Sequence, residues 1–395
     1  MSRISLGRRA ALAGGTALTA ASLIRPRSAR AAGKGLTVIL ESEATILDPH
    51  FTTAAITRTF GLHVFDTLFA MNEKGEIKPQ MIDSWETSSD KLGWTFVLRD
   101  GLKFHDGAPV TAADCVASLK RWAVRDALGK MLMAGTASVE ATDAKTLKFA
   151  LKEPFPMMLD VLGKPNAPLP VIMPARIAAT PADQRIPEPI GSGPFRFVKS
   201  AWRPGDTMVL ERNPDYVPRQ EAPDFLTGGK NVKIDQLTLR VMPDQSTGAN
   251  ALIAGEVDYM QYLPFDMLPV LEAEKALKFV SLGGIHQFQG NFRLNHAAPP
   301  FDNPAVRKVL WKCVDQDATL TAIGVPEKYR AKSCDSFWMC GAPLSTDAGA
   351  AGNKFDLAAA KAELKASGYK GEPVIIMEVA RSISETASRV LVQNL

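Results

Sequence analysis

The stretch WTFVLRDGLKFHDGAPVTAAD, residues 94–114, places two alternating runs of apolar residues around charged Asp-Gly turns. In the first run Phe96 and Leu98 share one face of a predicted strand, because side chains on a strand alternate between its two faces. A second strand is predicted at Leu102 and Phe104, after the first turn. The stretch therefore predicts a half-buried sheet, and it offers no obviously reactive group.

The same stretch ends at the start of a predicted helix. Thr111 and Asp114 are three residues apart, which is the spacing of a capping box. We predict a helix from 112 to about 129, with Cys115 inside it as a small buried apolar residue.

Residues 1–31 have the composition of an export signal. Adjacent Arg8 and Arg9 precede an uncharged run over 10–24, and Ala31 ends a small-x-small cleavage pattern. We expect cleavage after Ala31 and a periplasmic location. The paired arginines are compatible with twin-arginine export as well as the general secretory route.

The net charge depends on that segment. The 395-residue chain carries 46 basic and 42 acidic residues, a formal charge of +4, but residues 1–31 hold six arginines and no acidic residue. Without them the formal charge is about −2, so nucleic acid is not an expected partner. The length allows two or three domains, and an apolar fraction of 46% is ordinary for a globular protein.

Further blocks occur along the chain on both sides of the opening stretch. Before it stand LDPHFTT, VFDTLF and KPQMIDSWETS; after it stand PEPIGSGPFRFVKSAW, VLERNPDY, ALIAGEVD and GNFRLNHAAPPFDNPAVRKVLWKCVD. In kind and in order these blocks resemble the family 5 solute-binding proteins, the secreted receptors of peptide, nickel and oligosaccharide ABC importers. The resemblance covers residues 36–395.

The Gly-Ser-Gly-Pro run at 191–194 has two interpretations. It could cradle a phosphate, but no helix is predicted after it and no Lys-Thr or Lys-Ser follows, as a P-loop requires. We instead expect a tight crossing between lobes, where glycine permits close approach of two backbones.

The resemblance implies an α/β, two-lobed periplasmic binding protein fold of type II with an extra subdomain. We expect residues 32–69 and 190–282 to form lobe I, residues 70–189 to form a subdomain inserted in it, and residues 283–395 to form lobe II. Members of the family usually continue beyond this length, so the second lobe is expected to be incomplete.

Two elements are predicted near the end of the chain. Asp356 is placed as the cap of a helix that ends before Gly368, and residues 374–379 predict a strand.

Four cysteines occur, and an exported protein meets an oxidising compartment. Cys334 and Cys340 lie six residues apart in SCDSFWMCGAP, and we predict that they form a disulfide. A zinc site is the alternative, but no second pair of cysteines or histidines stands at ligand spacing. Cys313, like Cys115, falls inside a predicted helix.

The sequence contains neither G-x-S-x-G nor H-E-x-x-H. Ser88 and Lys91 match S-x-x-K, but they fall in a predicted polar turn and not at the helix start that this motif requires. The five histidines are dispersed, and a nickel or haem ligand among them stays open because some family members bind such cargo. Glu43 and Asp48 could act as an acid and base if folding set them at a suitable separation, so a secreted hydrolase is the alternative from another class. We expect a binding protein rather than an enzyme, with no cofactor and no metal site.

The resemblance implies a monomer whose lobes close on a ligand and deliver it to a membrane permease. We expect the ligand to be a peptide or a similar small polar solute; a nickel, opine or oligosaccharide receptor is the alternative within the family. Candidate cleft residues flank the segments between the lobes. They are Glu43, Asp48, His50, His286, Gln287, Gln289, Asn291 and Trp338.

Overall fold

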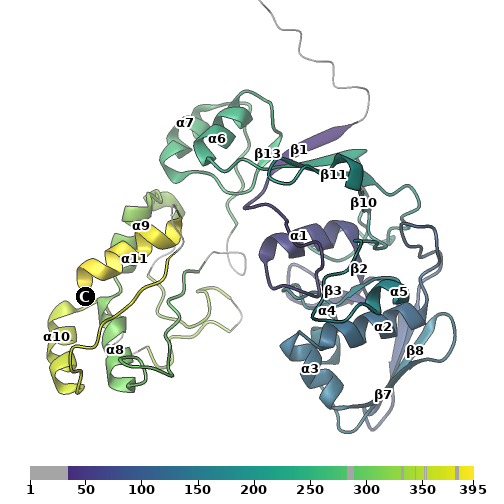
Figure 1. The fold of residues 1–395 in the computed structure, drawn as a ribbon, viewed down its shortest axis with the longest axis horizontal. Coiled ribbons are helices and arrows are strands. Elements are labelled where there is room, and N and C mark those ends of the chain that lie inside the picture. Colours follow the sequence, from purple (N-terminus) through teal and green to yellow (C-terminus); the bar gives the residue numbers. More distant parts are fainter. Residues whose placement is uncertain are drawn as a thin grey trace, which may run out of the picture.

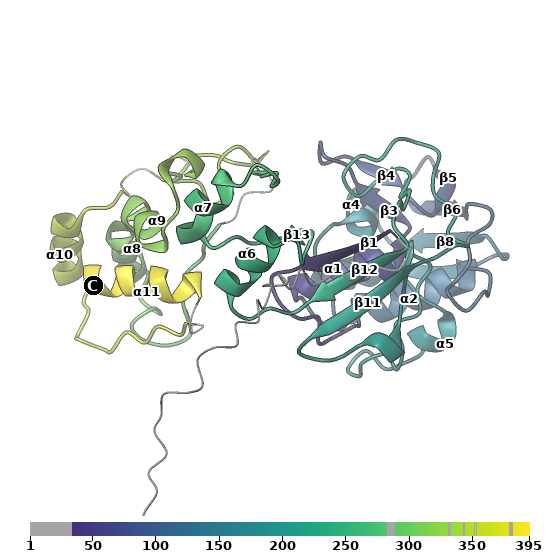
Figure 2. The same cartoon turned by 90° about the horizontal axis from the view of Figure 1, so that it is seen from above.

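The computed structural model describes residues 34–282, 289–330, 333–342, 344–350, 352, 354–378 and 382–395. The expected export signal lies outside these residues. Figures 1 and 2 show an N-terminal unit built on sheets beside a C-terminal unit of helices. Within the described ranges, no helix combines the length and apolar character needed to cross a membrane.

A five-stranded mixed sheet organises the N-terminal unit, with the strands in the order β10, β11, β12, β1, β13. β1 (Gly35–Ile39) runs parallel to both β12 (Gln236–Arg240) and β13 (Tyr259–Met260). β10 (Phe195–Phe197) and β11 (Thr207–Arg212) extend the sheet by antiparallel pairing. Backbone hydrogen bonds therefore join the beginning of the described chain to segments some two hundred residues later.

Helix α1 (Ala55–Val64) packs against this sheet. Its Phe60 and Val64 are fully buried in a core that also contains Leu210 of β11. The Phe60 ring meets Phe197 of β10 edge to face, with centroids 5.9 Å apart. The apolar stripe of α1 thus fixes the helix against the sheet, and the opposite side of α1 remains nearer to solvent.

Between α1 and β10 the chain builds a second, antiparallel sheet, in the order β5, β6, β8, β7. Two short strand pairs lie between this sheet and α1, and helices cover them. The elements are β2 (Asp66–Thr67), β3 (Phe69–Met71), β4 (Ile77–Pro79), β5 (Ile82–Thr87), β6 (Gly93–Leu98), β7 (Thr136–Ala141), β8 (Thr146–Leu151), β9 (Val171–Ile172), α2 (Ala112–Ala123), α3 (Ala127–Ala134), α4 (Met158–Gly163) and α5 (Ala175–Ala178).

The strand predicted from the opening stretch is confirmed as β6, and both Phe96 and Leu98 are buried in the core of this second sheet. The second predicted strand is wrong. Residues 102–104 form only an isolated bridge, in which Lys103 pairs with Pro109. The alternation of apolar residues correctly predicted that Leu102 and Phe104 are buried. The turn that follows comes too soon for a run of paired strand residues to form.

The capping box of Thr111 and Asp114 is also confirmed: each side chain accepts a hydrogen bond from the other residue's backbone N–H. The helix is shorter than predicted, because α2 ends at Ala123. Asp126 then caps α3 by accepting from the Gly129 N–H at 2.9 Å. Because Asp126 lies within a run of residues with helical apolar spacing, the sequence pattern predicted one continuous helix and missed that this aspartate caps a second one.

Helices α6 (Gln245–Ile253) and α7 (Leu268–Ala273) lie between the two units in Figure 2. They share a core with Ile39 of β1 and Met260 of β13. Glu272 of α7 forms an ion pair of 2.7 Å with Lys328, at the edge of the C-terminal unit. Residues 259–273 therefore contact both units.

The C-terminal unit consists of α8 (Pro304–Cys313), α9 (Gln316–Ile323), α10 (Leu357–Ala366) and α11 (Ile383–Asn394). Its small core is made by Val309, Cys313, Ala360 and Leu391. Short 3-10 turns complete the described chain at Lys199–Ala201, Phe265–Met267 and Glu327–Tyr329.

The predicted cap Asp356 is confirmed, since it accepts from the Ala359 N–H at the start of α10. The strand predicted at 374–379 is not found in its described part, 374–378. Ile375 and Met377 are 80% and 94% exposed there. A strand needs a neighbour for its backbone groups, and no strand of the described chain lies beside this segment.

The crossing at 191–194 returns the chain from the second sheet to the first. A Cβ atom on Gly191 would lie 2.1 Å from the carbonyl oxygen of Val64, and one on Gly193 would lie 2.6 Å from the Val64 carbonyl carbon. The Gly193 N–H donates to that oxygen at 3.0 Å. The expected close approach of two backbones is confirmed, and it sets the end of α1 against β10. The expected position between the lobes is wrong, because both backbones belong to the N-terminal unit.

Gly191→Ala should destabilise the N-terminal unit, because its methyl group overlaps backbone that cannot move aside cheaply. We expect a loss of about 2 kcal/mol or more in the free energy of unfolding, measured by urea denaturation. Gly135→Ala is the control, since its new Cβ would have no neighbour closer than 3.7 Å. Equal unfolding midpoints for the two variants would contradict this account of the crossing.

Candidate functional site

The carboxyl ends of the parallel strands β1 and β13 lie at one edge of the five-stranded sheet. Ligands of open α/β sheets bind at such an edge, where connections leave neighbouring strands in different directions. The loop 40–54 follows β1 here and carries three of the expected cleft residues. The structure gives them different surroundings.

Glu43 is half-buried at this edge. Its Oε1 accepts a hydrogen bond of 2.8 Å from the Gly205 N–H, which precedes β11. Glu43 also lines a pocket of about 20 Å³ together with Trp202 and Met208. That volume suits a single water molecule, so a ligand larger than water would have to reach Glu43 from outside the pocket.

Asp48 does not face a cleft. Its carboxylate is buried and forms a two-pronged pair with Arg121 of α2, at 3.1 and 2.7 Å. It also accepts from the backbone N–H groups of His50 and Ile186. The expectation that Asp48 contacts a ligand is corrected: all its acceptor capacity is used to join loop 40–54 to α2 and to the segment before the crossing.

His50 is likewise fully buried. Its Nε2–H donates to the Val171 carbonyl oxygen at 3.0 Å, while Nδ1 has no hydrogen-bond partner among the described residues. Burial lowers the pKa of His50 to about 4, against a smaller raising effect of the Asp48 carboxylate. The imidazole is therefore neutral at ordinary pH and supports β9, and its expected place in the cleft is corrected as well.

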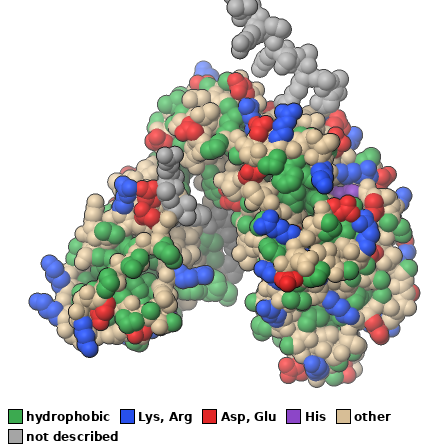
Figure 3. Space-filling view, in the orientation of Figure 1, with side chains coloured by type: hydrophobic (Ala, Val, Ile, Leu, Met, Phe, Trp, Pro, Cys, Tyr) green, Lys and Arg blue, Asp and Glu red, His purple; other side chains and the backbone are tan. Residues whose placement is uncertain are grey.

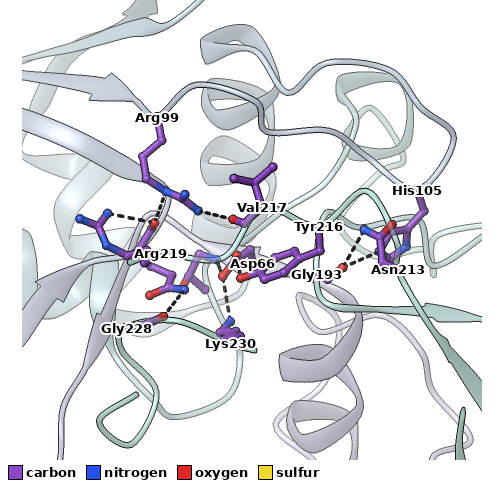
Figure 4. Close-up of polar contacts among 12 residues, drawn as sticks. Asp66, Arg99, His105, Gly193, Asn213, Tyr216, Val217, Arg219, Gly228 and Lys230 are labelled. Atoms are coloured by element: carbon purple, nitrogen blue, oxygen red, sulfur yellow. Dashed lines mark hydrogen bonds and ion pairs between the residues drawn. The ribbon is translucent and has the colours of Figure 1, made fainter. Parts of the chain in front are cut away.

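A polar network in the N-terminal unit was not predicted from the sequence (Figure 4). Buried Asp66 accepts from the Tyr216 hydroxyl at 3.0 Å and forms an ion pair of 2.9 Å with Lys230. Burial, and then the Asp66 carboxylate, raise the pKa of Tyr216. These contacts hold residues 213–230 against β2, and their donors and acceptors are used within the protein.

Charged residues of the opening stretch join the same arrangement. Arg99 donates to the carbonyl oxygens of Gln80 and Val217, and His105 donates through Nε2 to the Gly193 carbonyl oxygen at 3.1 Å (Figure 4). Burial lowers the pKa of His105 to about 4. These groups attach the second sheet to the returning chain and are not available to a ligand.

The C-terminal unit presents the remaining candidates. Gln289 donates to the Phe337 carbonyl oxygen at 3.2 Å, and Asn291 is exposed. Trp338 is 49% exposed and meets the Phe337 ring edge to face, with centroids 5.1 Å apart. His286 and Gln287 lie outside the described residues.

The Phe337-Trp338 pair stands in a closed loop, because the structure joins Cys334 to Cys340 by a disulfide with Cα atoms 5.8 Å apart. The Gln316 side chain accepts from the Cys334 N–H and donates to its carbonyl oxygen. An exposed aromatic pair is thus held on a constrained loop. In Figure 1 the segment between α9 and α10 lies on the side of the C-terminal unit that faces the N-terminal unit.

A second unpredicted group lies at the sheet edge itself. We call Glu41, Arg58 and Tyr262 the edge cluster. Burial and the Glu41 carboxylate raise the pKa of Tyr262, while the Arg58 guanidinium lowers it, so each of the two charges lies within electrostatic reach of Tyr262. The Arg58 Nε is shielded from solvent and has no hydrogen-bond partner among the described residues. The apolar spacing of residues 56–69 predicted the buried side of α1. It gave no indication that Arg58 would lie near Tyr262.

The fold matches solved receptors. MoaA of A. tumefaciens R10, solved in complex with mannopinic acid, superposes with a TM-score of 0.66 at 26% identity, over 85% of this chain and 66% of that chain. The mixed sheet, its second antiparallel sheet and the facing C-terminal unit thus define an α/β, two-lobed periplasmic binding protein.

Sequence comparison gives the family. The model of bacterial extracellular solute-binding proteins, family 5 Middle, matches residues 76–393. The chain belongs to this family of solute-binding proteins.

Two named relatives agree with that placement. A probable peptide ABC transporter periplasmic-binding protein of Sinorhizobium fredii, y4tO, is 37% identical over 94% of this chain and 69% of its own length. The glutathione-binding protein GsiB of Pectobacterium atrosepticum is 32% identical over 81% of this chain and 58% of its own length. The family and these relatives are binding proteins of transport systems, not enzymes.

Asp48→Asn should strongly destabilise the N-terminal unit, because it leaves Arg121 buried without a compensating charge. We expect a loss of about 3 to 5 kcal/mol in the free energy of unfolding, measured in urea to avoid added salt. Arg176→Gln is the control: Arg176 is half-exposed and pairs with Asp106 and Glu188. Its loss should stay below about 1 kcal/mol. Similar losses in the free energy of unfolding for both variants would contradict the larger contribution expected of the buried Asp48 pair.

Three histidines whose pKa is lowered by burial, His50, His63 and His105, should make the protein sensitive to acid. The pKa values of His50 and His105, about 4, lie below the ordinary histidine value of 6.5, so as pH falls the unfolded state takes up protons before the folded state does. Stability is then full above pH 6.5 and declines toward pH 4, by roughly 3 kcal/mol for each of these two histidines.

Urea unfolding of the wild type and of His105→Gln at several pH values tests this dependence. The variant should lose the part of the decline between pH 6.5 and 4 that His105 contributes, roughly 3 kcal/mol, while His296→Gln, at an exposed position, should retain the full decline. A decline of unchanged steepness in His105→Gln would exclude a contribution from His105.

Proposed function

We propose that this chain is the periplasmic receptor of an ABC importer and captures a peptide or a similar small polar solute between its two units. The observation that carries the proposal is the arrangement across the molecule. The carboxyl edge of the five-stranded sheet belongs to one unit, and the disulfide-closed aromatic loop of residues 334–340 belongs to the other. Figure 3 shows a hollow between the two units on the face drawn.

Each side supplies a different kind of contact. At the sheet edge the edge cluster and Glu43 offer charged and hydroxyl groups, which recognise the polar ends of a solute. The exposed Trp338 ring offers flat apolar surface that accepts varied side chains. Gln289, which donates to the loop, and the exposed Asn291 would supply further polar contacts, and we keep His286 and Gln287 as candidates in the same segment of the sequence.

Closure of one unit onto the other would bury a solute held at both surfaces. Residues 259–273 contact both units, so they are placed to act as the hinge. A membrane permease would then recognise the closed monomer, and no bond of the solute would be made or broken. Residues 1–31 would direct export and be removed after Ala31.

An opine acid is the second candidate ligand. The specific observation in its favour is the similarity to MoaA, which was solved with mannopinic acid. A nickel receptor lacks comparable support: among the described residues, no group of three or more His, Cys, Asp or Glu side chains is placed to hold a metal. Peptides and opine acids share charged carboxylates and many hydrogen-bonding groups.

A thermal-shift screen of the chain tests the proposal. Pools of di- and tripeptides, glutathione, mannopinic acid, nickel with histidine, and oligosaccharides are added separately. A solute that binds only the folded state at 100 times its Kd adds about 2.7 kcal/mol to stability and raises Tm by a few degrees. We expect the peptide or opine pool to do so.

Mass spectrometry of the recovered solute separates binding from catalysis. The receptor proposal requires the solute to be returned unchanged. Conversion of the solute that is abolished by Glu43→Gln would instead support the secreted hydrolase, and the absence of a shift with every pool would contradict receptor function for this chain.

A further inference from the structure

We infer that Arg58 binds a carboxylate of the ligand, and that the receptor therefore selects anionic solutes. The inference rests on the proposed receptor function and names the chemistry of its site at the sheet edge. Three observations carry it: the Nε of Arg58 has no hydrogen-bond partner among the described residues, Arg58 lies near the start of α1, and Tyr262 lies within its electrostatic reach.

Arg58 differs from three other arginines that the fold partly or fully buries. Arg121 pairs with Asp48, Arg196 pairs with Asp215, and Arg219 pairs with Glu221. Arg58 has no carboxylate within 4 Å among the residues that the structure describes, and its shielded Nε donates no hydrogen bond there.

Five shielded side-chain atoms lack a partner in the described chain, and Arg58 Nε is the one that belongs to a permanently charged group. A shielded guanidinium N–H without a partner is unfavourable in the free protein, since it has given up water without gaining an acceptor. A ligand carboxylate would remove that deficit.

The position of Arg58 is that expected for a ligand contact. It lies in the first turns of α1, directly after the loop that leaves β1, and within electrostatic reach of Tyr262 beyond the end of β13. Two backbone contacts fix this corner: the Glu41 N–H donates to Gln261 Oε1, and the Gln261 N–H donates to the Ile39 carbonyl oxygen.

The neighbours suit a carboxylate. Tyr262 is 44% exposed, so its hydroxyl can donate to an oxygen that the guanidinium also holds. A guanidinium presents parallel N–H groups that match the two oxygens of a carboxylate, which makes the contact directional as well as strong. The C-terminus of a peptide and the acid group of an opine both provide this group.

The experiment compares acids with their amides. The probes are the tripeptide Ala-Ala-Ala and its C-terminal amide, and mannopinic acid and its carboxamide, titrated calorimetrically into the wild type and Arg58→Gln. We expect at least one acid to bind the wild type, and its amide to bind about 10- to 100-fold more weakly. In Arg58→Gln the acid should lose a similar factor, and amidation should then have little further effect.

Arg125→Gln is the matched control, because Arg125 is an exposed arginine of the same unit that lies over the Phe51 ring. It should bind the acid as the wild type does. Arg58→Lys keeps the charge without the parallel N–H groups and should recover part of the affinity. Urea midpoints and the far-ultraviolet circular dichroism of each variant establish that it is folded.

The remaining outcomes separate this inference from the receptor proposal. If amidation weakens binding equally in the wild type and in folded Arg58→Gln, the carboxylate is held elsewhere and the inference is wrong. If only neutral solutes bind the wild type, the receptor proposal stands and the anionic specificity is rejected. If no solute of either kind binds the wild type, both are rejected.

Discussion

The buried pair of Asp48 and Arg121 is the contact on which the N-terminal unit depends most. Two ions removed from water are tolerable only when each satisfies the other and their remaining hydrogen-bonding groups are used. Here Arg121 also donates to the carbonyl oxygens of Thr180 and Gln184, and Asp48 accepts from two backbone N–H groups. One pair thereby fixes loop 40–54, helix α2 and the segment before the crossing. The first residues of that loop are left at the sheet edge, and the proposed site lies there.

A similar use of charge holds the second sheet to the first. Asp66 with Tyr216 and Lys230, and Arg99 with two carbonyl oxygens, bridge segments that are far apart in the chain. The backbone contact of Gly193 with Val64 closes the same junction. These contacts tie the second sheet, the returning chain and α1 together. Closure on a ligand would then be borne by residues 259–273, where the chain leaves the last strand of the first sheet.

Local features of the fold were predictable because their partners are near in sequence. The capping box at Thr111 depends on Asp114, three residues away, and the alternation that predicted the buried face of Phe96 is local, although the rings that cover Phe96 are not. The site was less predictable. Asp48 and His50 were chosen as polar residues in a loop after a strand, but the partner of Asp48 lies 73 residues away and that of His50 lies 121 residues away. A sequence shows which side chains can bind a ligand, whereas the fold decides which of them are already occupied.

Access from solvent also distinguishes Arg58 Nε from other side-chain atoms that lack a hydrogen-bond partner in the described chain. His50 Nδ1 and Ser192 Oγ are on residues buried within the unit, where no solute can reach them without unfolding. Arg58 lies beside a partly exposed tyrosine at the carboxyl edge of a parallel strand pair. A receptor must keep some polar groups unsatisfied until its ligand arrives, because groups already paired contribute no affinity. A partly exposed charged group with a shielded, unpaired N–H meets that requirement, whereas the paired charges of the opening stretch serve the fold.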